Sequence, residues 1–263
     1  MISAPGDENR PENTAHCPLP TADYFHDKII VFMNETSPYP RFRVCGDSGL
    51  LVEFGATIEP SVHRQVMHLF RGLKEKNIGG VLDVVPAYAS LLVQIDPWRI
   101  SFERLRMEID EVLADAAIIE QEHAAEGRIV DIPVSYGGED GPDLEDVCRY
   151  HGLSVKEVIA LHTAPLYTVY MIGFTPGFPY LGGLDPRLIT PRRTTPRKRV
   201  PAGSVGIADR QTGIYSIDSP GGWQLIGRTP LLLFDPTGER PFLLEPGDRI
   251  RFVPIPDCKE ISP

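Results

Sequence analysis

Residues 173–222 combine a large excess of glycine and proline with aromatic side chains and directed hydrogen-bond donors. The segment holds nine glycines and seven prolines, whereas average usage predicts about six of the two types together. Glycine permits positive φ angles and close backbone approach, and proline fixes φ. Because the segment also carries Phe, Tyr, Trp, Ile and Leu, it differs from a disordered linker. We therefore predict tightly folded loops that line a concave binding surface.

Residues 219–228 contain the groups best suited to hold an anion. Two adjacent glycines let backbone N–H groups approach an anion closely, and a tryptophan offers a large rigid contact surface. A glutamine and an arginine add directed donors, and a guanidinium suits carboxylate or phosphate. The alternative is a purely structural turn. We predict that Arg228 is catalytic, and the predicted substrate contacts are Pro220, Gly221, Gly222, Trp223 and Gln224.

Residues 173–183, with the sequence GFTPGFPYLGG, form the second candidate loop. Its aromatic residues alternate in a way that also suits a half-buried strand, so the segment is either a ligand loop or a tight turn with buried aromatics. Taken as a ligand loop, its predicted substrate contacts are Phe174, Pro176, Gly177, Phe178 and Tyr180.

Other polar groups in the same half of the chain add to this site. His162 ends a predicted helix, where it is either a hydrogen-bonded structural residue or a general acid or base, and it is our second catalytic candidate. Residues 187–199 carry six basic residues and no acid, and this run is either a solvated surface or a clamp for a carboxylate or an acidic partner. Neutral donors and acceptors on the next segment suit an amide or lactam ring. The predicted contacts here are Arg192, Gln211, Thr212 and Tyr215.

Standard catalytic signatures are absent from the sequence. It has no Gly-x-x-x-x-Gly-Lys-Ser/Thr phosphate loop, no His-Glu-x-x-His, no Gly-x-Ser-x-Gly and no Gly-x-Gly-x-x-Gly. The other histidines lack metal-ligand spacing, so we predict no metal site. They are His16, His26, His63, His68, His123 and His151.

Composition limits the class of protein. The net charge of −10 argues against general nucleic-acid binding, and no run of about 18 apolar residues predicts a membrane span. The first residues lack the basic and apolar regions of a signal peptide, so we expect a protein that is not exported. Four scattered cysteines fit unpaired thiols in a reducing cytoplasm.

The first part of the chain predicts a flexible extension, residues 1–38, followed by an α+β domain over residues 39–119. Hydrophobic periodicity gives the order ββαββα, which suggests a small antiparallel sheet with two helices on one face, a ferredoxin-like layer. Ser61 and Ser101 are the expected helix caps. The predicted strands cover residues 41–46, 49–54, 81–85 and 90–95, and the helices cover residues 61–76 and 102–117.

The second part predicts a charged linker, residues 120–128, a domain over residues 129–256, and a tail, residues 257–263. One strand comes first, and two helices capped by Asp143 and Ser154 follow it. Short strands and Gly/Pro turns then favour a barrel or a sandwich. The helices are expected at residues 143–150 and 154–163, and the strands at residues 129–136, 167–172, 199–205, 206–207, 213–217, 223–228, 231–234 and 248–253.

Five motifs in the second part follow one another in the order and spacing of a single family. They are GFTPGFPYLG at 173–182, TPRR at 190–193, VPAGSVGI at 200–207, QTGIY at 211–215 and PGGWQLIG at 220–227. On these motifs the chain resembles the allophanate hydrolase subunit 1 family over about residues 41–253. The resemblance implies a cyclophilin-like β-barrel behind the ferredoxin-like domain, and the family has a histidine at the position of His162. The chain departs from the pattern at residues 208–210 and at Ser216, where the family usually has glycines and proline.

The family includes the B subunit of the bacterial 5-oxoprolinase, and the resemblance to it implies a hydrolase component that is inactive alone. With subunits A and C it would open the lactam of 5-oxo-L-proline to L-glutamate at the expense of ATP. Since the sequence lacks a nucleotide motif, the ATP site would be unorthodox or supplied largely by a partner. Two alternatives stay open: a Kip-type inhibitor of a histidine kinase, and half of a biotin-dependent carboxyltransferase. Because no Ala-Met-Lys-Met-like motif occurs, biotin would be carried on another chain.

Overall fold

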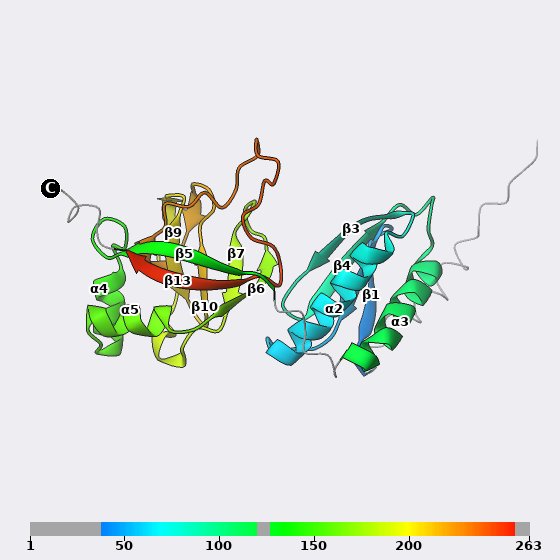
Figure 1. The fold of residues 1–263 in the computed structure, drawn as a ribbon, viewed down its shortest axis with the longest axis horizontal. Helices are drawn as coiled ribbons and strands as arrows, with labels where there is room; N and C mark the ends of the chain where they lie inside the picture. Colours follow the sequence, from blue (N-terminus) through cyan, green and yellow to red (C-terminus); the bar gives the residue numbers. More distant parts are fainter. Residues whose placement is uncertain (1–37, 120–126, 256–263) are drawn as a thin grey trace, which may run out of the picture.

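The structure is a computed structural model, and it describes residues 38–119 and 127–255. Almost all of the predicted extension, most of the predicted linker and the predicted tail lie outside these ranges. The described residues form two units, a four-stranded sheet with two helices and a closed barrel (Figure 1).

The first unit is an antiparallel sheet in the order β1-β2-β4-β3. Side chains alternate along its strands, so that Leu50, Val52, Leu91 and Val93 are buried on one face. The two helices contact each other and share the same apolar cluster, so they cover that face. The elements are β1 (Arg41–Cys45), β2 (Gly49–Glu53), α2 (Pro60–Lys76), β3 (Val81–Pro86), β4 (Ser90–Ile95) and α3 (Phe102–Ile119).

The N-termini of the two helices in this unit can be compared with the predicted caps. Ser101 is confirmed, because its Oγ accepts a hydrogen bond from the backbone N–H of Arg104 at 3.2 Å. The prediction of Ser61 is wrong, since α2 begins one residue earlier, with Glu59 as N-cap and Pro60 in the first turn. Proline is favoured there because its φ is preset for a helix and its missing N–H would have had no partner in the helix.

The second unit is a closed barrel in the order β10-β7-β6-β13-β5-β12-β9, which decides between the barrel and sandwich predictions. The pair β5 and β13 is parallel, and the other paired strands of the barrel run antiparallel. The strands are β5 (Ile129–Tyr136), β6 (Tyr167–Ile172), β7 (Pro179–Gly182), β9 (Ser204–Ala208), β10 (Gln211–Ile214), β12 (Gln224–Arg228) and β13 (Arg249–Ile255).

Two short helices pack on the barrel, α4 (Leu144–His151) and α5 (Val155–Thr163), on its side remote from the first unit (Figure 1). The cap predicted at Ser154 is confirmed, and the structure shows it as part of a capping box. The Ser154 hydroxyl accepts from the backbone N–H of Glu157, and the Glu157 carboxylate accepts from that of Ser154. A 3₁₀ turn, η1 (Pro186–Leu188), contacts both helices.

The predicted strand at residues 199–205 is wrong. The chain instead forms β8 (Arg197–Val200), turns, and then enters the barrel as β9. Pro201 lacks a backbone donor and Gly203 has φ of 83°, so both favour the turn. Strand β8 pairs with β11 (Ser219–Gly221) outside the barrel. The predicted strand at residues 231–234 is also wrong, because only Phe234 forms a bridge there, to Phe242.

Candidate functional site

Three aromatic residues of the motif region form a second small core. Phe178, Tyr215 and Trp223 are 1%, 1% and 5% exposed. The Phe178 ring meets the rings of Trp223 and Tyr215 edge-on, with centroids 5.4 and 5.3 Å apart. Such edge-to-face contacts stabilise an aromatic cluster beyond its buried area.

This aromatic core lies on the outer face of the barrel. Ile207 and Ile214 point into the barrel core, so the alternating glycines Gly206 and Gly213 face outward. A Cβ on Gly213 would lie 3.0 Å from both the Trp223 and Phe178 rings, which leaves no room for a side chain. The glycines of these motifs therefore let aromatic rings pack directly on the strands.

The structure places the predicted contacts of the first loop in different environments. Phe178 is buried and Tyr180 is partly buried beside it, with ring centroids 4.9 Å apart. Phe174 is 62% exposed at φ of 63°, an unusual angle for a bulky residue. The loop is held by Ser216, whose Oγ donates to the Pro176 carbonyl at 2.6 Å. Ser216 therefore helps to hold this loop in place.

A polar rim surrounds the aromatic core where the two units meet. Tyr88, in the turn between β3 and β4, accepts a hydrogen bond on its hydroxyl oxygen from Gln211 Nε2. Its ring centroid lies 6.0 Å from that of Tyr180. The Arg192 guanidinium carbon lies 6.0 Å from the centroid of Trp223. We name Tyr88, Tyr180, Arg192 and Gln211 the junction site.

Sequence reasoning missed Tyr88. Its place in a turn follows from the strands predicted at residues 81–85 and 90–95, which match β3 and β4. A turn in the first unit gives no local signal that its side chain reaches the second. Burial raises the pKa of Tyr88 and of Tyr180, while the positive charge of Arg192 lowers both pKa values in part. The two phenols are therefore protonated near neutral pH, and each can donate a hydrogen bond.

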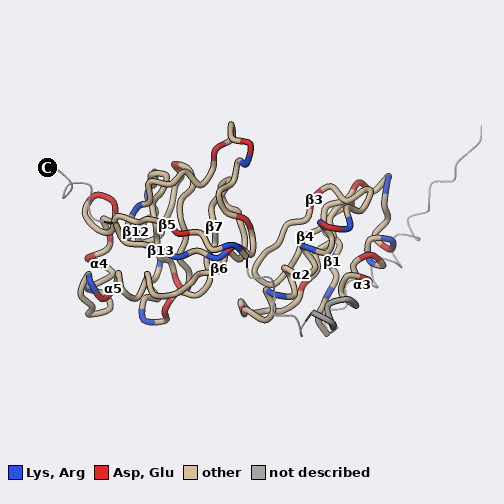
Figure 2. Tube along the Cα trace, in the orientation of Figure 1, with Lys and Arg blue, Asp and Glu red and all other residues tan. Residues whose placement is uncertain are grey.

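The basic run predicted as an anion clamp is paired within the protein. Lys and Arg are interspersed with Asp and Glu over both units (Figure 2). Within the run, Arg187 pairs with Asp185, and Arg199 pairs with Asp218. Arg192 Nε lies 3.4 Å from Asp209 Oδ2 in an exposed pair. Such a pair contributes little stability, so Arg192 can exchange partners at small cost.

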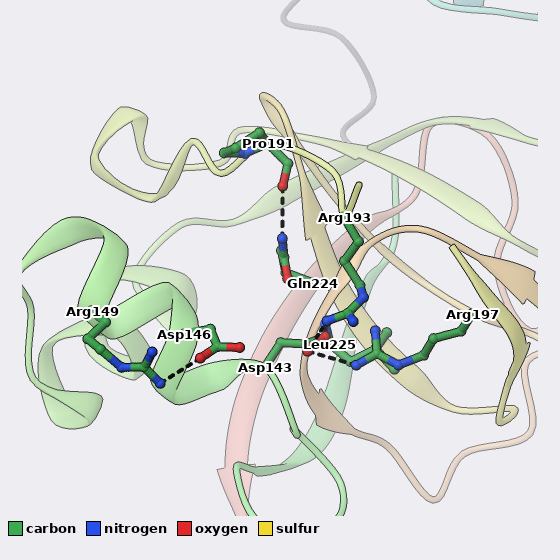
Figure 3. Close-up of polar contacts among 8 residues, drawn as sticks. All are labelled: Asp143, Asp146, Arg149, Pro191, Arg193, Arg197, Gln224 and Leu225. Carbon is green, nitrogen blue, oxygen red and sulfur yellow. Dashed lines mark hydrogen bonds and ion pairs between the residues drawn. The ribbon is translucent and has the colours of Figure 1, made fainter. Parts of the chain in front are cut away.

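Asp143 joins two other arginines of the run to the barrel (Figure 3). Its Oδ1 accepts from Arg193 Nη1 at 2.8 Å and from Arg197 Nη2 at 2.7 Å, while its Oδ2 accepts from the backbone N–H of Leu225 at 2.7 Å. Asp143 stands at the N-cap position of α4 as predicted, but its side chain makes no capping hydrogen bond. Its carboxylate binds the two arginines instead. A further hydrogen bond joins the basic run to β12, since Gln224 Nε2 donates to the Pro191 carbonyl at 3.0 Å.

His162 is fully buried in the barrel core rather than at the rim, and its ring stacks on that of the core residue Phe252 at 4.5 Å. Thr212 Oγ1 donates its one proton to the Gly206 carbonyl at 2.9 Å, so His162 Nε2, 3.0 Å away, carries a proton and donates to Thr212. Nδ1 then accepts from the Tyr136 hydroxyl at 2.8 Å. Burial lowers the pKa of His162 to about 3, so the ring is neutral.

We expect this neutral histidine to make the protein less stable in acid. The unfolded chain binds a proton on His162 near its ordinary pKa of 6.5, whereas the folded chain resists it down to about 3. The free energy of unfolding therefore falls as pH drops from about 6.5, by at most about 1.4 kcal/mol per pH unit for this residue. Urea denaturation at pH 6.5, 5.8 and 5.0 measures the slope. His162→Gln should show a shallower slope than the wild type, and equal slopes would contradict a neutral buried His162.

Arg228 lies apart from the junction site. It ends β12, whereas Gln224 begins this strand and donates to the carbonyl of Pro191, the neighbour of Arg192. Arg228 donates through its Nε to the Ala202 carbonyl at 2.9 Å, and it lines an open groove of about 370 Å³. Other groove-lining residues include Ser135, Asp140, Ser216, Thr229 and Leu232. The two predicted catalytic residues therefore lie in different surroundings: His162 is buried and hydrogen-bonded to Thr212, whereas Arg228 lines an open groove.

Neither a metal centre nor a membrane-crossing helix is found in the parts of the chain that the structure describes. Within those parts no three His, Cys, Asp or Glu residues gather as metal ligands, and no helix is both long and apolar enough to span a bilayer.

Comparison with known protein families matches residues 40–244 to the carboxyltransferase domain, subdomains C and D. The chain belongs to this carboxyltransferase domain family. It is 44% identical over 220 residues to the 5-oxoprolinase B subunit of Bacillus subtilis (strain 168), covering 80% of this chain and 90% of that protein. It is more distantly similar to urea amidolyase of Lachancea kluyveri, at 26% identity over 90% of this chain but 14% of that protein.

Solved structures share the fold. The crystal structure of TTHA0988 matches with a TM-score of 0.71 and 44% identity, covering 80% of this chain. The chain spans about 40% of that solved chain's length. The family resemblance drawn from the five motifs is confirmed by the family match and the identity to the Bacillus subtilis protein.

Proposed function

We propose that this chain is the B subunit of an ATP-dependent 5-oxoprolinase, which opens the lactam of 5-oxo-L-proline to L-glutamate. One observation carries the proposal: the 44% identity to a protein named as this component of 5-oxoprolinase extends over 90% of that protein. The similarity to urea amidolyase is weaker and covers only 14% of that protein. It therefore supports the carboxyltransferase alternative less strongly than the Bacillus subtilis relative supports 5-oxoprolinase.

We propose the junction site as the place where 5-oxoproline binds. The substrate is a small ring that carries one carboxylate, one carbonyl and one N–H. Arg192 can leave its exposed pair with Asp209 to bind the carboxylate, and Tyr180 beside the aromatic core can pack against the ring. Ligand sites commonly form where two structural units meet.

The two residues predicted as catalytic take other roles in this proposal. His162 has no exposed surface, so it acts as a positioning residue that fixes Thr212, the neighbour of Gln211 on β10. Arg228 lines a separate groove, and Arg192 replaces it as the carboxylate ligand. Phe174, Pro176, Gly177 and the turn around Pro220–Gly222 support the aromatic core or face a partner protein.

We further propose that subunits A and C complete the active site. A lactam without ring strain is a stabilised amide, and ATP would supply its activation by phosphorylating the lactam oxygen. The sequence has no nucleotide-binding motif, so most ATP-binding groups would come from a partner. We place this complex in the cytoplasm, where the unpaired Cys45 and Cys148 would remain reduced.

We propose that the two units are separate domains, residues 39–119 and residues 129–256. The first has the ββαββα order and one helix-covered face of a ferredoxin-like layer, and the closed barrel of the second supports a cyclophilin-like assignment.

Reconstitution tests the proposed function. We expect no ATP-dependent glutamate from 5-oxoproline with the isolated chain, and glutamate together with phosphate release once subunits A and C of the same organism are added. Glutamate formation by the isolated chain would contradict a shared site. An assembled complex without activity would contradict the function itself. In that case a co-purifying biotinylated chain would favour a carboxyltransferase, and a co-purifying histidine kinase would favour a Kip-type inhibitor.

A further inference from the structure

We propose that Tyr88, supplied by the first unit, is a specificity-determining residue that recognises the lactam together with Gln211. This inference rests on the proposed function and deepens it. It assigns the first unit a direct part in substrate recognition.

The hydrogen bond between the two residues leaves one donor and one acceptor free. Gln211 Nε2 donates to the Tyr88 hydroxyl oxygen, so the proton of that hydroxyl points to another acceptor. Within the residues described, no acceptor takes this proton and no donor reaches Gln211 Oε1. Both residues are only partly buried.

The free donor and acceptor match the two polar edges of a lactam. A five-membered ring holds its amide in the cis form, so its C=O and N–H lie on one side. The Tyr88 hydroxyl can donate to the carbonyl, and Gln211 Oε1 can accept from the ring N–H. Arg192 is near the same group, since its guanidinium carbon lies 6.0 Å from the Trp223 ring centroid, and Tyr180 lies between the Trp223 ring, at 6.2 Å, and the Tyr88 ring, at 6.0 Å. The same ligand can therefore present its carboxylate to the guanidinium. A site that pairs each polar group rejects analogues that lack one of them.

Contacts across the junction hold Tyr88 in place. Its ring centroid lies 5.7 Å from Tyr170 and 6.0 Å from Tyr180, both on the barrel. His63 of α2 packs edge-on against the Tyr170 ring at 4.3 Å, and its Nε2 lies 2.9 Å from the Tyr170 carbonyl oxygen. Burial lowers the pKa of His63 to about 4, so it is neutral and donates this hydrogen bond near pH 7. The pairing of the two units therefore fixes the Tyr88 hydroxyl before substrate arrives.

Kinetics of the assembled complex test the proposal. Tyr88→Phe keeps the ring and its packing but removes the hydroxyl. We expect the KM for 5-oxoproline to rise about five- to tenfold, the effect of one directed hydrogen bond. We expect kcat to change less than about twofold and the KM for ATP to stay unchanged, which a general loss of structure would not produce. Gln211→Leu should raise the same KM. Because each residue orients the other, the double variant should lose less than the product of the single losses.

Tyr150→Phe is the matched control, because this tyrosine is 63% exposed on α4 and its ring packs against that of the neighbouring His151. It should leave both KM values unchanged. An unchanged KM for 5-oxoproline in an active Tyr88→Phe complex overturns this inference while the proposed function stands. An inactive wild-type complex overturns both. A fall in melting temperature above about 4 °C in Tyr88→Phe, with both KM values altered, would assign Tyr88 a structural role instead.

Discussion

Replacement of Asp143 by alanine is expected to lower the free energy of unfolding by about 3 kcal/mol. The carboxylate is 3% exposed and accepts from two guanidinium groups and one backbone N–H. Its removal leaves two arginines without their shared counter-ion and the Leu225 N–H without an acceptor. Breaking a buried pair typically costs about 3–5 kcal/mol, and the partial exposure of both arginines favours the lower figure. Urea denaturation at pH 7 measures the change.

Asp146 provides the control for this variant. It lies three residues further along and pairs with Arg149 at 2.6 Å, but both side chains are exposed (Figure 3). Asp146→Ala should cost less than about 1 kcal/mol. If the two alanine variants lose similar stability, the buried cluster is not what joins residues 193–197 to the barrel.

The second large effect is expected for Trp223. Trp223→Ala removes the ring that packs over Gly213 and meets Phe178 edge-on. Deletion of a buried tryptophan side chain costs about 3–5 kcal/mol. We expect a loss of this size in the free energy of unfolding, and the resulting collapse of the rim should also abolish activity of the complex.

The chain's other tryptophan is the matched control, since Trp98 is 95% exposed in the first unit. Trp98→Ala should change the free energy of unfolding by less than about 0.5 kcal/mol. A loss below about 1 kcal/mol for Trp223→Ala would show that the aromatic core contributes little to the fold, and the motif glycines would then need another explanation.

Local patterns predicted most of the secondary structure. Alternating residues indicated the strands of the first unit, and Ser154 as a helix cap indicated the start of α5. The family motifs correctly indicated the barrel. The strand predicted at residues 199–205 failed because Pro201 and Gly203 form a turn between β8, outside the barrel, and β9, within it. A continuous apolar pattern does not record such a turn.

The candidate site was harder to predict, because it depends on contacts between distant residues. Asp143 fitted a capping pattern, yet its partners are about fifty residues away in the sequence. Histidine is a common catalytic residue, so His162 was predicted as one. Its burial depends on the barrel core packed around it, which the sequence does not reveal. Tyr88 reaches Gln211 across 123 positions, a distance at which sequence periodicity carries no signal.

The glycines of the motifs illustrate the same difference between composition and packing. Their excess predicts loops around a ligand. Gly206 and Gly213 instead lie in strands, where they make room for Trp223 and Phe178. The excess therefore marks the correct region of the molecule, although part of it serves packing rather than binding.

The location of 5-oxoproline in a crystal structure of the assembled complex tests the central claim most directly. We predict ligand density at the junction site, with the carboxylate within hydrogen-bond distance of Arg192 and the lactam between the Tyr88 hydroxyl and Gln211. Density in the groove beside Arg228, or wholly within a partner protein, would contradict the account.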